Sequence, residues 1–431
     1  MRTPNRRSVL LAASLAAAPV LARAADETIS ESAIAEALTR YDGFGIKASG
    51  GPGDIACGAW VEGELRAAGL TTRRQAFDIP FATLTRSSLT CGAATAEVIA
   101  QAVVRPTPPE GLTAKLVVFD PAWSSAAACK DAIALIILPY RRWSAAAGEP
   151  KAAVDAVMAA GAMAAVLITT GPTGEACALN VPNAAGWWDR PVAILAPKQA
   201  APFLKAAATS QTARLDLTGT SGRRSAFNVI GILARGKAKT LVLSTPRSGW
   251  FTCTGERGSG LAAWLELVRW TARSQTGVNI AVIATSGHEY DYAGGEAFIR
   301  ELAPRPADVA LWTHLGANVA TRDWAEQGAN LLPLPSADPQ RTLAASPDLL
   351  DACRAAFSGQ PGIEAPREFN ASVAGELASI RTAGYTRVMG IFGSHRFHHT
   401  RADNLRCTSP ALARQAATSF QTVITQALRT V

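Results

Sequence analysis

The strongest constraint on the fold is a regular alternation of strand-like and helix-like segments in the second half of the chain. Short apolar runs at 240–244, 279–284 and 309–315 alternate with amphipathic patterns at 261–273 and 295–302. This alternation is typical of parallel strands whose connecting helices cover the sheet. We therefore predict an α/β fold with a mostly parallel sheet covered by helices on both faces.

The same pattern continues to the C-terminus, where a further strand is expected at 386–392. The start of the last helix is marked by Ser409 followed by Pro410, a typical cap and first helical residue. The other expected helices cover 31–38, 54–70, 347–357 and 376–383.

A segment of different texture, roughly 98–222, interrupts this pattern. Strand-like runs at 115–119, 132–138 and 165–168 are joined by turns rich in proline and alanine, and a short helix at 152–160 is closed by Gly161. We interpret the segment as an inserted β-rich domain, followed by a linker at 221–226. The predicted divisions are 1–24, 25–97, 98–222 and 223–431.

The first 24 residues have the features of a secretory signal peptide. Arg6 and Arg7 precede an apolar run over 9–22, and Ala22-Arg23-Ala24 forms a cleavage pattern of small residues. The paired arginines indicate the twin-arginine route, so we expect a periplasmic or secreted protein. No later segment has the ~18 uninterrupted apolar residues that a membrane span needs.

Composition excludes several other classes of protein. Apolar residues make up 48% and charged residues 18% of the 431 residues, which is typical of a globular protein. The formal charge of +8 includes four arginines of the signal segment, and the remaining basic residues are scattered, so nucleic acid is not an expected partner. The seven cysteines lack the clustered spacing of a structural zinc site.

The five histidines all lie in the last 144 residues, and each follows or closes a predicted strand. Because ligands of α/β sheets bind at the C-terminal ends of strands, we expect these histidines to form one polar pocket. For two of them, solvated loop positions are the alternative interpretation. The five are His288, His314, His395, His398 and His399, and the two with this alternative are His395 and His398.

Acidic residues accompany the histidines in the same loops. Glu256 lies in a glycine-rich turn before a helix, and Glu289 and Asp291 follow His288. Carboxylate and imidazole together suit a zinc ion, which acts as a Lewis acid and activates water.

The order and texture of these loops resemble the zinc aminopeptidases of metallopeptidase family 28. The segments 45–54 and 63–70 are similar to the N-terminal helix pair of that family, and 227–233 resembles the strand that opens its catalytic core. The insertion resembles a protease-associated domain, most clearly at 159–168. The resemblance implies a hydrolase that cleaves amide or peptide bonds in peptides or small amides.

The catalytic positions of the family are matched only in part. Where the first histidine ligand is expected, the chain has Ser244-Thr-Pro-Arg-Ser, and Glu256 replaces the bridging aspartate. The Glu-Glu pair of base and ligand appears as His288-Glu289. The next aspartate falls at or near His314, and the final histidine is kept as His399, with His398 at a tyrosine position.

These substitutions favour one zinc ion over two. A two-metal site needs two sets of ligands that share a carboxylate, and one set here has lost its histidine. The other set can be assembled from Glu256, Glu289 and His399, with His288 as the base that takes a proton from water. Further candidates for a ligand or for substrate binding are His314, His398, His395, Asp291, Arg247 and Arg257.

Two alternatives remain open at the level of sequence. Arg247 or Arg257 could neutralise the acids and fill the place of the ion, which would leave a metal-free, catalytically inactive binding or scaffold protein. A metal-independent hydrolase could instead use Cys253 or Ser286 with His288, although neither residue lies in a known nucleophile motif.

Overall fold

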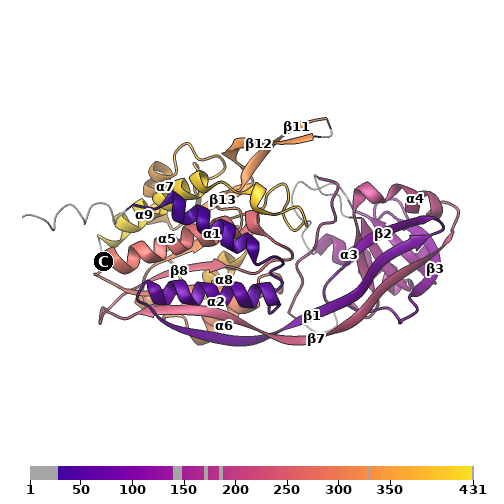
Figure 1. Cartoon of the computed structure of the whole chain (residues 1–431), viewed down its shortest axis with the longest axis horizontal. Helices are drawn as coiled ribbons and strands as arrows, with labels where there is room; N and C mark the ends of the chain where they lie inside the picture. The colour runs from indigo at the N-terminus through magenta and orange to yellow at the C-terminus, as the bar shows by residue number, and fades with distance from the viewer. Residues whose placement is uncertain (1–27, 139–147, 169–172, 184–187, 329, 430–431) are drawn as a thin grey trace, which may run out of the picture.

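The computed structural model describes residues 28–138, 148–168, 173–183, 188–328 and 330–429. Two lobes lie side by side, joined by two long antiparallel strands, β1 (Thr71–Cys91) and β7 (Thr212–Leu233), which run from one lobe into the other (Figure 1). The predicted signal peptide lies outside the described residues. No helix in the described ranges is long and apolar enough to cross a membrane.

The first lobe is built on the end of one continuous sheet, in the order β7-β9-β8-β10-β15-β13-β14. Four central strands are mutually parallel, whereas β7 and β13 are antiparallel to their neighbours β9 and β15. The bounds are β8 Thr240–Pro246, β9 Asn279–Thr285, β10 Val309–Leu315, β13 Arg341–Ala345, β14 Arg367–Glu368 and β15 Val388–Gly393. The prediction of an α/β fold with a mainly parallel sheet is confirmed.

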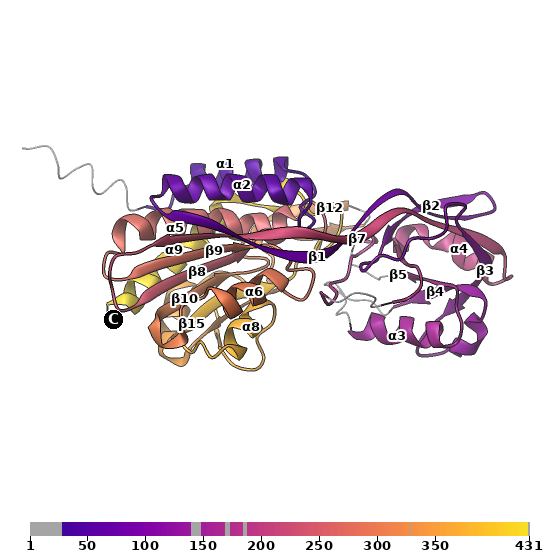
Figure 2. The same cartoon turned by 90° about the horizontal axis from the view of Figure 1, so that it is seen from below.

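Helices cover both faces of this sheet because alternate strand residues point to opposite sides. Leu241 and Leu243 of β8 belong to the larger core, on the face of α1, α5 and α9, whereas Val242 packs with α6 and α8 (Figure 2). The bounds are α1 Glu31–Gly43, α2 Pro52–Ala67, α5 Ser259–Ser274, α6 Ala293–Glu301, α7 Leu350–Ala356, α8 Glu376–Thr382 and α9 Pro410–Leu428. The hydroxyl of Ser409 caps α9 as predicted, accepting a hydrogen bond from the Leu412 amide.

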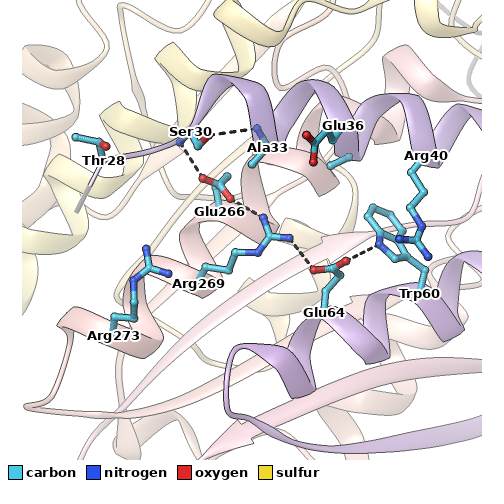
Figure 3. A pocket seen from close by; sticks show the side chains of 11 residues that line it. Thr28, Ser30, Ala33, Glu36, Arg40, Trp60, Glu64, Glu266, Arg269 and Arg273 are labelled. Atoms are coloured by element: carbon cyan, nitrogen blue, oxygen red, sulfur yellow. Dashed lines mark hydrogen bonds and ion pairs between the residues drawn. The ribbon is translucent and has the colours of Figure 1, made fainter. Parts of the chain in front are cut away.

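An ionic cluster ties α1, α2 and α5 together on the outer face of the first lobe (Figure 3). Arg269 of α5 contacts Glu64 of α2 at 2.7 Å and Glu266 at 2.5 Å. The other oxygen of Glu266 accepts a hydrogen bond from the Ser30 amide, where α1 begins. These contacts hold α1 and α2 against α5, so the ionic cluster has a structural role.

The second lobe has its own hydrophobic cores on the two faces of its part of the sheet. Phe203 of α4 packs into one core, and Val154 and Val157 of α3 pack into the other. The strands β3 to β6 are parallel to one another, and β2 lies antiparallel to β6. The bounds are β2 Ala94–Ala100, β3 Leu112–Phe119, β4 Ala132–Ile137, β5 Ala164–Ile168, β6 Val192–Leu195, α3 Gly148–Ala159 and α4 Ala201–Ala207.

Two segments differ from the expectation. The predicted linker at 221–226 is part of β7, where it pairs with β1 in an unbroken register from Ser221 opposite Ala82 to Ala226 opposite Phe77. The segment between β10 and the helix expected at 347–357, for which no strand was predicted, contains the hairpin of β11 (Arg322–Gln327) and β12 (Asn330–Ala337). All seven cysteines are free and buried.

We predict that the two lobes respond separately to core mutations. Leu116→Ala removes a fully buried side chain of the second lobe and should destabilise that lobe by about 2–5 kcal/mol. Hydrogen exchange should accelerate at the amides of β4 and remain unchanged at those of β8. Leu311→Ala, in the first lobe, is the matched control with the reverse pattern. Equal acceleration in both lobes for either variant would contradict the prediction.

Candidate active site

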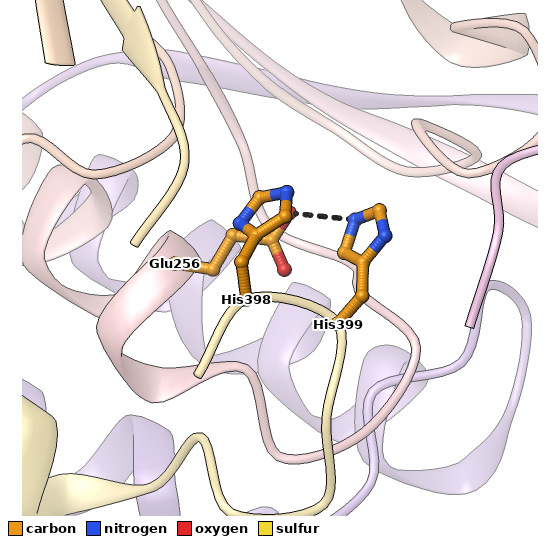
Figure 4. Close-up of side chains that lie close together, drawn as sticks. All are labelled: Glu256, His398 and His399. Atoms are coloured by element: carbon orange, nitrogen blue, oxygen red, sulfur yellow. Dashed lines mark ion pairs between the residues drawn. The ribbon is translucent and has the colours of Figure 1, made fainter. Parts of the chain in front are cut away.

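Three of the expected site residues converge at the C-terminal edge of the parallel strands. Glu256 lies on a single π-helical turn, Thr254–Gly258, before α5, and His398 and His399 lie on the loop after β15. All three are buried, and one ligand atom from each lies within 4.8 Å of the others (Figure 4). The Glu256 carboxylate oxygen Oε1 is 3.3 Å from His399 Nε2 and 3.7 Å from His398 Nε2.

The buried carboxylate of Asp403 fixes the turn that carries Glu256. Asp403 accepts hydrogen bonds from the backbone amides of Gly255 at 2.7 Å and Glu256 at 3.0 Å. A side chain at Gly255 would meet the Asp403 carboxylate at 2.6 Å, so only glycine allows this approach. Asp403 also contacts His395 Nε2 at 3.2 Å. Burial opposes the charged form of His395, but Asp403 outweighs it and raises the pKa of the imidazole. His395 is therefore a buried partner of Asp403.

The second lobe orients His399. The backbone carbonyl of Ala178 lies 2.9 Å from His399 Nδ1, and the Ala178 amide donates to the His399 carbonyl at 3.0 Å. Because a carbonyl only accepts hydrogen bonds, Nδ1 carries the proton and the lone pair of Nε2 faces Glu256. His398 stacks on His399 with the ring centres 4.1 Å apart. Histidines that bind metals typically donate a hydrogen bond from one ring nitrogen to a carbonyl, which orients the other nitrogen towards the metal.

Glu289 lies apart from this trio. One carboxylate oxygen accepts hydrogen bonds from the hydroxyls of Ser49 and Ser248, both at 2.9 Å, and the other is 3.8 Å from Arg257 Nη2. The amide of Val181, from the second lobe, donates to the backbone carbonyl of Glu289. Glu289 is thus held by serines and an arginine, while His398 stands in the trio beside Glu256.

The guanidinium of Arg257 is close to both acids. Its Nη2 is 2.6 Å from Glu256 Oε1, and its Nε donates to the Ser248 carbonyl. Burial opposes ionisation of Glu256, but Arg257 together with His398 and His399 holds the pKa of the carboxyl well below its usual range. From the sequence, Arg247 or Arg257 was expected to neutralise these acids, and in the structure Arg257 does so.

Arg247 forms a separate buried ion pair. Its Nε is 3.1 Å from Asp54 of α2, and its two Nη atoms donate to the carbonyls of Ala284 and Phe227. Arg247 and Asp54 are both fully buried, so each compensates the charge of the other. Arg247 therefore links α2 to the sheet and does not neutralise Glu256 or Glu289 in the described structure.

His288 and His314 meet a residue that sequence reasoning missed, Glu376 at the start of α8. Glu376 lies 3.4 Å from His288 Nδ1 and 4.0 Å from His314 Nδ1, and accepts a hydrogen bond from the Thr285 hydroxyl at 2.8 Å. Burial opposes its ionisation, but the hydrogen bond from His288 and the nearby imidazoles lower its pKa to about 2. Acids are so common in the first turn of a helix that the position of Glu376 did not indicate this role.

The remaining candidates lie outside this cluster. Asp291 is exposed at the turn before α6. Cys253 is buried against the Tyr41 hydroxyl at 3.1 Å, and burial raises the pKa of its thiol well above the usual range. The Ser286 hydroxyl donates to Asp54 at 2.7 Å. Neither Cys253 nor Ser286 forms a hydrogen bond with His288 in the described structure, so neither is arranged as a nucleophile with that base.

Several polar atoms of the trio lack a hydrogen-bond partner in the described structure, although Arg257 forms an ion pair with Glu256. Neither oxygen of Glu256 accepts a hydrogen bond in the described structure, nor does His399 Nε2 form one, although all three atoms are buried. Unpartnered buried acceptors are costly, and a cation bound between them would satisfy all of them. One carboxylate and two imidazoles are also ligands that zinc prefers.

The chain has the architecture of known zinc aminopeptidases. A zinc aminopeptidase from Bacillus subtilis matches with a TM-score of 0.72 and 16% identity, over 93% of this chain and 96% of the other. A peptidase M28 precursor from Shewanella amazonensis matches with a TM-score of 0.71 and 17% identity, over 94% and 95%. An aminopeptidase from Aneurinibacillus gives 0.65 and 14%, over 93% and 95%.

The fold is that of the zinc aminopeptidases. The predicted resemblance to metallopeptidase family 28 is thereby confirmed at the level of the fold. No model of a known protein family and no curated protein matches the sequence. The large central sheet and its helical layers extend through the whole alignment, so the site described above lies at the sheet edge of a recognised architecture.

We predict that Arg247 contributes to stability and not to metal binding. Arg247→Met leaves Asp54 as an unpaired buried charge and should lower the free energy of unfolding by about 3–5 kcal/mol, measured by urea denaturation. Arg414→Met, which breaks a surface ion pair with Glu31, is the control and should cost at most about 1 kcal/mol. Similar losses in both variants would argue against a buried Arg247–Asp54 pair.

Glu376 should make stability depend on pH in acid. Its pKa is about 2 in the folded protein and near the ordinary 4.5 in the unfolded chain, so its carboxylate stabilises the fold above pH 4.5. This contribution is lost as the pH falls from 4.5 towards 2. Glu376→Gln should therefore flatten the dependence of unfolding free energy on pH in that window. Glu364→Gln, at an exposed position, should leave the curve unchanged. A parallel curve for Glu376→Gln would refute the assignment.

Proposed function

We propose that the protein is an exported hydrolase of peptide or small amide bonds that works with one bound divalent cation, zinc by the chemistry of its ligands. The observation that carries the proposal is the convergence of Glu256, His398 and His399 with buried atoms that lack hydrogen-bond partners. The fold, shared with aminopeptidases, supports the same reaction class.

Glu256, His398 and His399 would hold the ion, with His399 already oriented by the Ala178 carbonyl. A zinc ion in such a site polarises a carbonyl group and makes water more acidic. Glu289, which the sequence favoured as a ligand, contributes negative charge at 3.8 Å from Nη2 of Arg257. One cation with three protein ligands leaves a coordination position open for substrate or water.

His288 is the proposed general base. The carboxylate of Glu376 only accepts hydrogen bonds, so His288 presents Nδ1–H to it and keeps a lone pair on Nε2. About 10% of the His288 side chain is exposed, in contrast to the fully buried groups around it. Nε2 can therefore take a proton from a water molecule, while Glu376 stabilises the imidazolium that forms.

Other parts of the chain support the proposals on export and substrate class. Arg6 and Arg7 with the apolar run after them support export by the twin-arginine route to the periplasm or beyond. The residues 177–181 of the second lobe lie against both the His399 loop and the Glu289 loop. A site closed by a neighbouring lobe favours chain ends and small amides over the middle of a folded protein.

A metal-free binding protein is the second candidate, and the contact between Arg257 and Glu256 favours it. At 2.6 Å this ion pair already compensates the carboxylate that a cation would need. The pKa of the Arg257 guanidinium is raised because Glu256 and Glu289 outweigh the effect of burial. In this case the pocket is held by arginine and carboxylates alone, and a chelator has no effect on it.

Metal analysis distinguishes the two candidates. We expect about one zinc per chain in protein purified with metal, and a lower melting temperature after treatment with a chelator, because an ion bound to the folded state stabilises it. His399→Ala should lose the zinc, and the exposed Asp291→Asn should keep it. Hydrolysis of aminoacyl para-nitroanilides should follow the zinc content. Zinc-free protein whose melting temperature ignores the chelator would favour the second candidate.

A further inference from the structure

A chain of buried hydrogen bonds fixes the ring of His314. The indole Nε1–H of Trp312 donates to the hydroxyl oxygen of Ser244 at 2.8 Å, and the same oxygen lies 2.9 Å from His314 Nδ1. An indole only donates, so the Ser244 oxygen accepts from Trp312, and in the described structure the Ser244 hydroxyl has no acceptor other than His314 Nδ1 for its own hydrogen. Nδ1 of His314 is therefore an acceptor, and the proton of the neutral ring lies on Nε2.

His288 is held in the opposite tautomer. Glu376 and its partner Thr285 make Nδ1 of His288 the donor, so its Nε2 is an acceptor. Glu376 lies between the rings, at 3.4 Å from one Nδ1 and 4.0 Å from the other. The site thus contains two imidazoles with opposite proton positions, one able to accept a proton and one able to donate a hydrogen bond.

We propose that His314 is a second catalytic imidazole, which donates a hydrogen bond from Nε2–H to the substrate carbonyl oxygen while His288 accepts a proton from water. This inference rests on the proposed hydrolysis and deepens it. The water oxygen bonds to the carbonyl carbon, and the π electrons move to the oxygen that His314 contacts. The proton on His288 then passes to the leaving nitrogen as the carbon–nitrogen bond breaks.

The surroundings of His314 suit a neutral donor. Burial lowers its pKa to about 4 against the opposing charge of Glu376, so the ring is uncharged near neutral pH. A β-carbon at Gly316 would lie 3.1 Å from Nε2, so glycine at this position leaves room beside that nitrogen. A neutral imidazole held by a low pKa can polarise a carbonyl without giving up its proton.

The tautomer of His314 also explains how the proposed reaction can proceed without a second metal ion. The sequence resemblance aligns His314 with an aspartate, whose carboxylate would attract a cation. An imidazole that presents N–H towards the reacting group cannot coordinate an ion through that nitrogen. The charge that develops on the substrate oxygen would instead be stabilised by a hydrogen bond set in place before the reaction.

Substitutions in the intact mature protein test the proposal. His314→Leu should lower kcat on an aminoacyl para-nitroanilide by about 10²–10³-fold with little change in KM, as for the loss of one oxyanion donor. His314→Gln keeps an N–H donor and should recover part of the rate. Thr313→Val is the matched control, because the neighbouring buried hydroxyl makes no hydrogen bond in the described structure. Zinc content should be the same in all variants.

Two measurements do not depend on turnover. Nitrogen-15 NMR should show protonated Nε2 in His314, and Ser244→Ala should produce a mixture of tautomers. A tetrahedral aminoalkyl boronate should bind more weakly to His314→Leu than to Thr313→Val, measured by calorimetry. A proton on Nδ1 in the native protein, or unchanged kcat and boronate affinity in His314→Leu with zinc still bound, would overturn the role of His314. Absence of zinc and of activity in the native protein would instead remove the proposed function on which that role rests.

Discussion

The cost of burying ionised groups governs the carboxyl-terminal edge of this sheet. Glu256, Arg257, Glu289 and Glu376 are all at most 3% exposed, and an isolated charge at such a depth would be strongly destabilising. Each is compensated within a few ångströms, by another charge, by serine hydroxyls or by imidazole. The positions of the loops are therefore set by charge pairing as much as by packing. Among the described residues, both oxygens of Glu256 and Nε2 of His399 nevertheless lack a hydrogen-bond partner, and they lie close together.

The architecture was predictable because apolar residues recur with the period of a strand or a helix in most elements of the first lobe. The strand predicted at 309–315 matches β10, and Ser409 caps the last helix. The ribbon of β1 and β7 was missed apart from the end of β7 at 227–233, because much of it is exposed and rich in threonine, serine and arginine. Its glycine-containing segment 221–226 has the composition of a linker, and long-range pairing with β1 makes it a strand.

Individual site residues were predictable only where the residue types in a loop indicated metal binding or catalysis. Glu256 and His399 were expected as ligands and His398 only as a further candidate, and the structure brings these three together across more than 140 residues of chain, without the expected ligand Glu289. The partner of each residue was not predictable, since distances between loops depend on the whole fold. Arg257 and Arg247 are equally plausible in sequence, and only three-dimensional packing assigns one to Glu256 and the other to Asp54.

The second lobe enters and leaves through strands that are hydrogen-bonded neighbours. Its two junctions with the rest of the chain are therefore separated by one strand spacing, about 5 Å, and a tight turn could close the gap if the lobe were absent. An ancestor without the lobe is thus sterically simple. It would, however, lack the Ala178 carbonyl, so His399 would be free to switch tautomer and rotate. Through this one carbonyl, the second lobe determines the orientation of a side chain that belongs to the first.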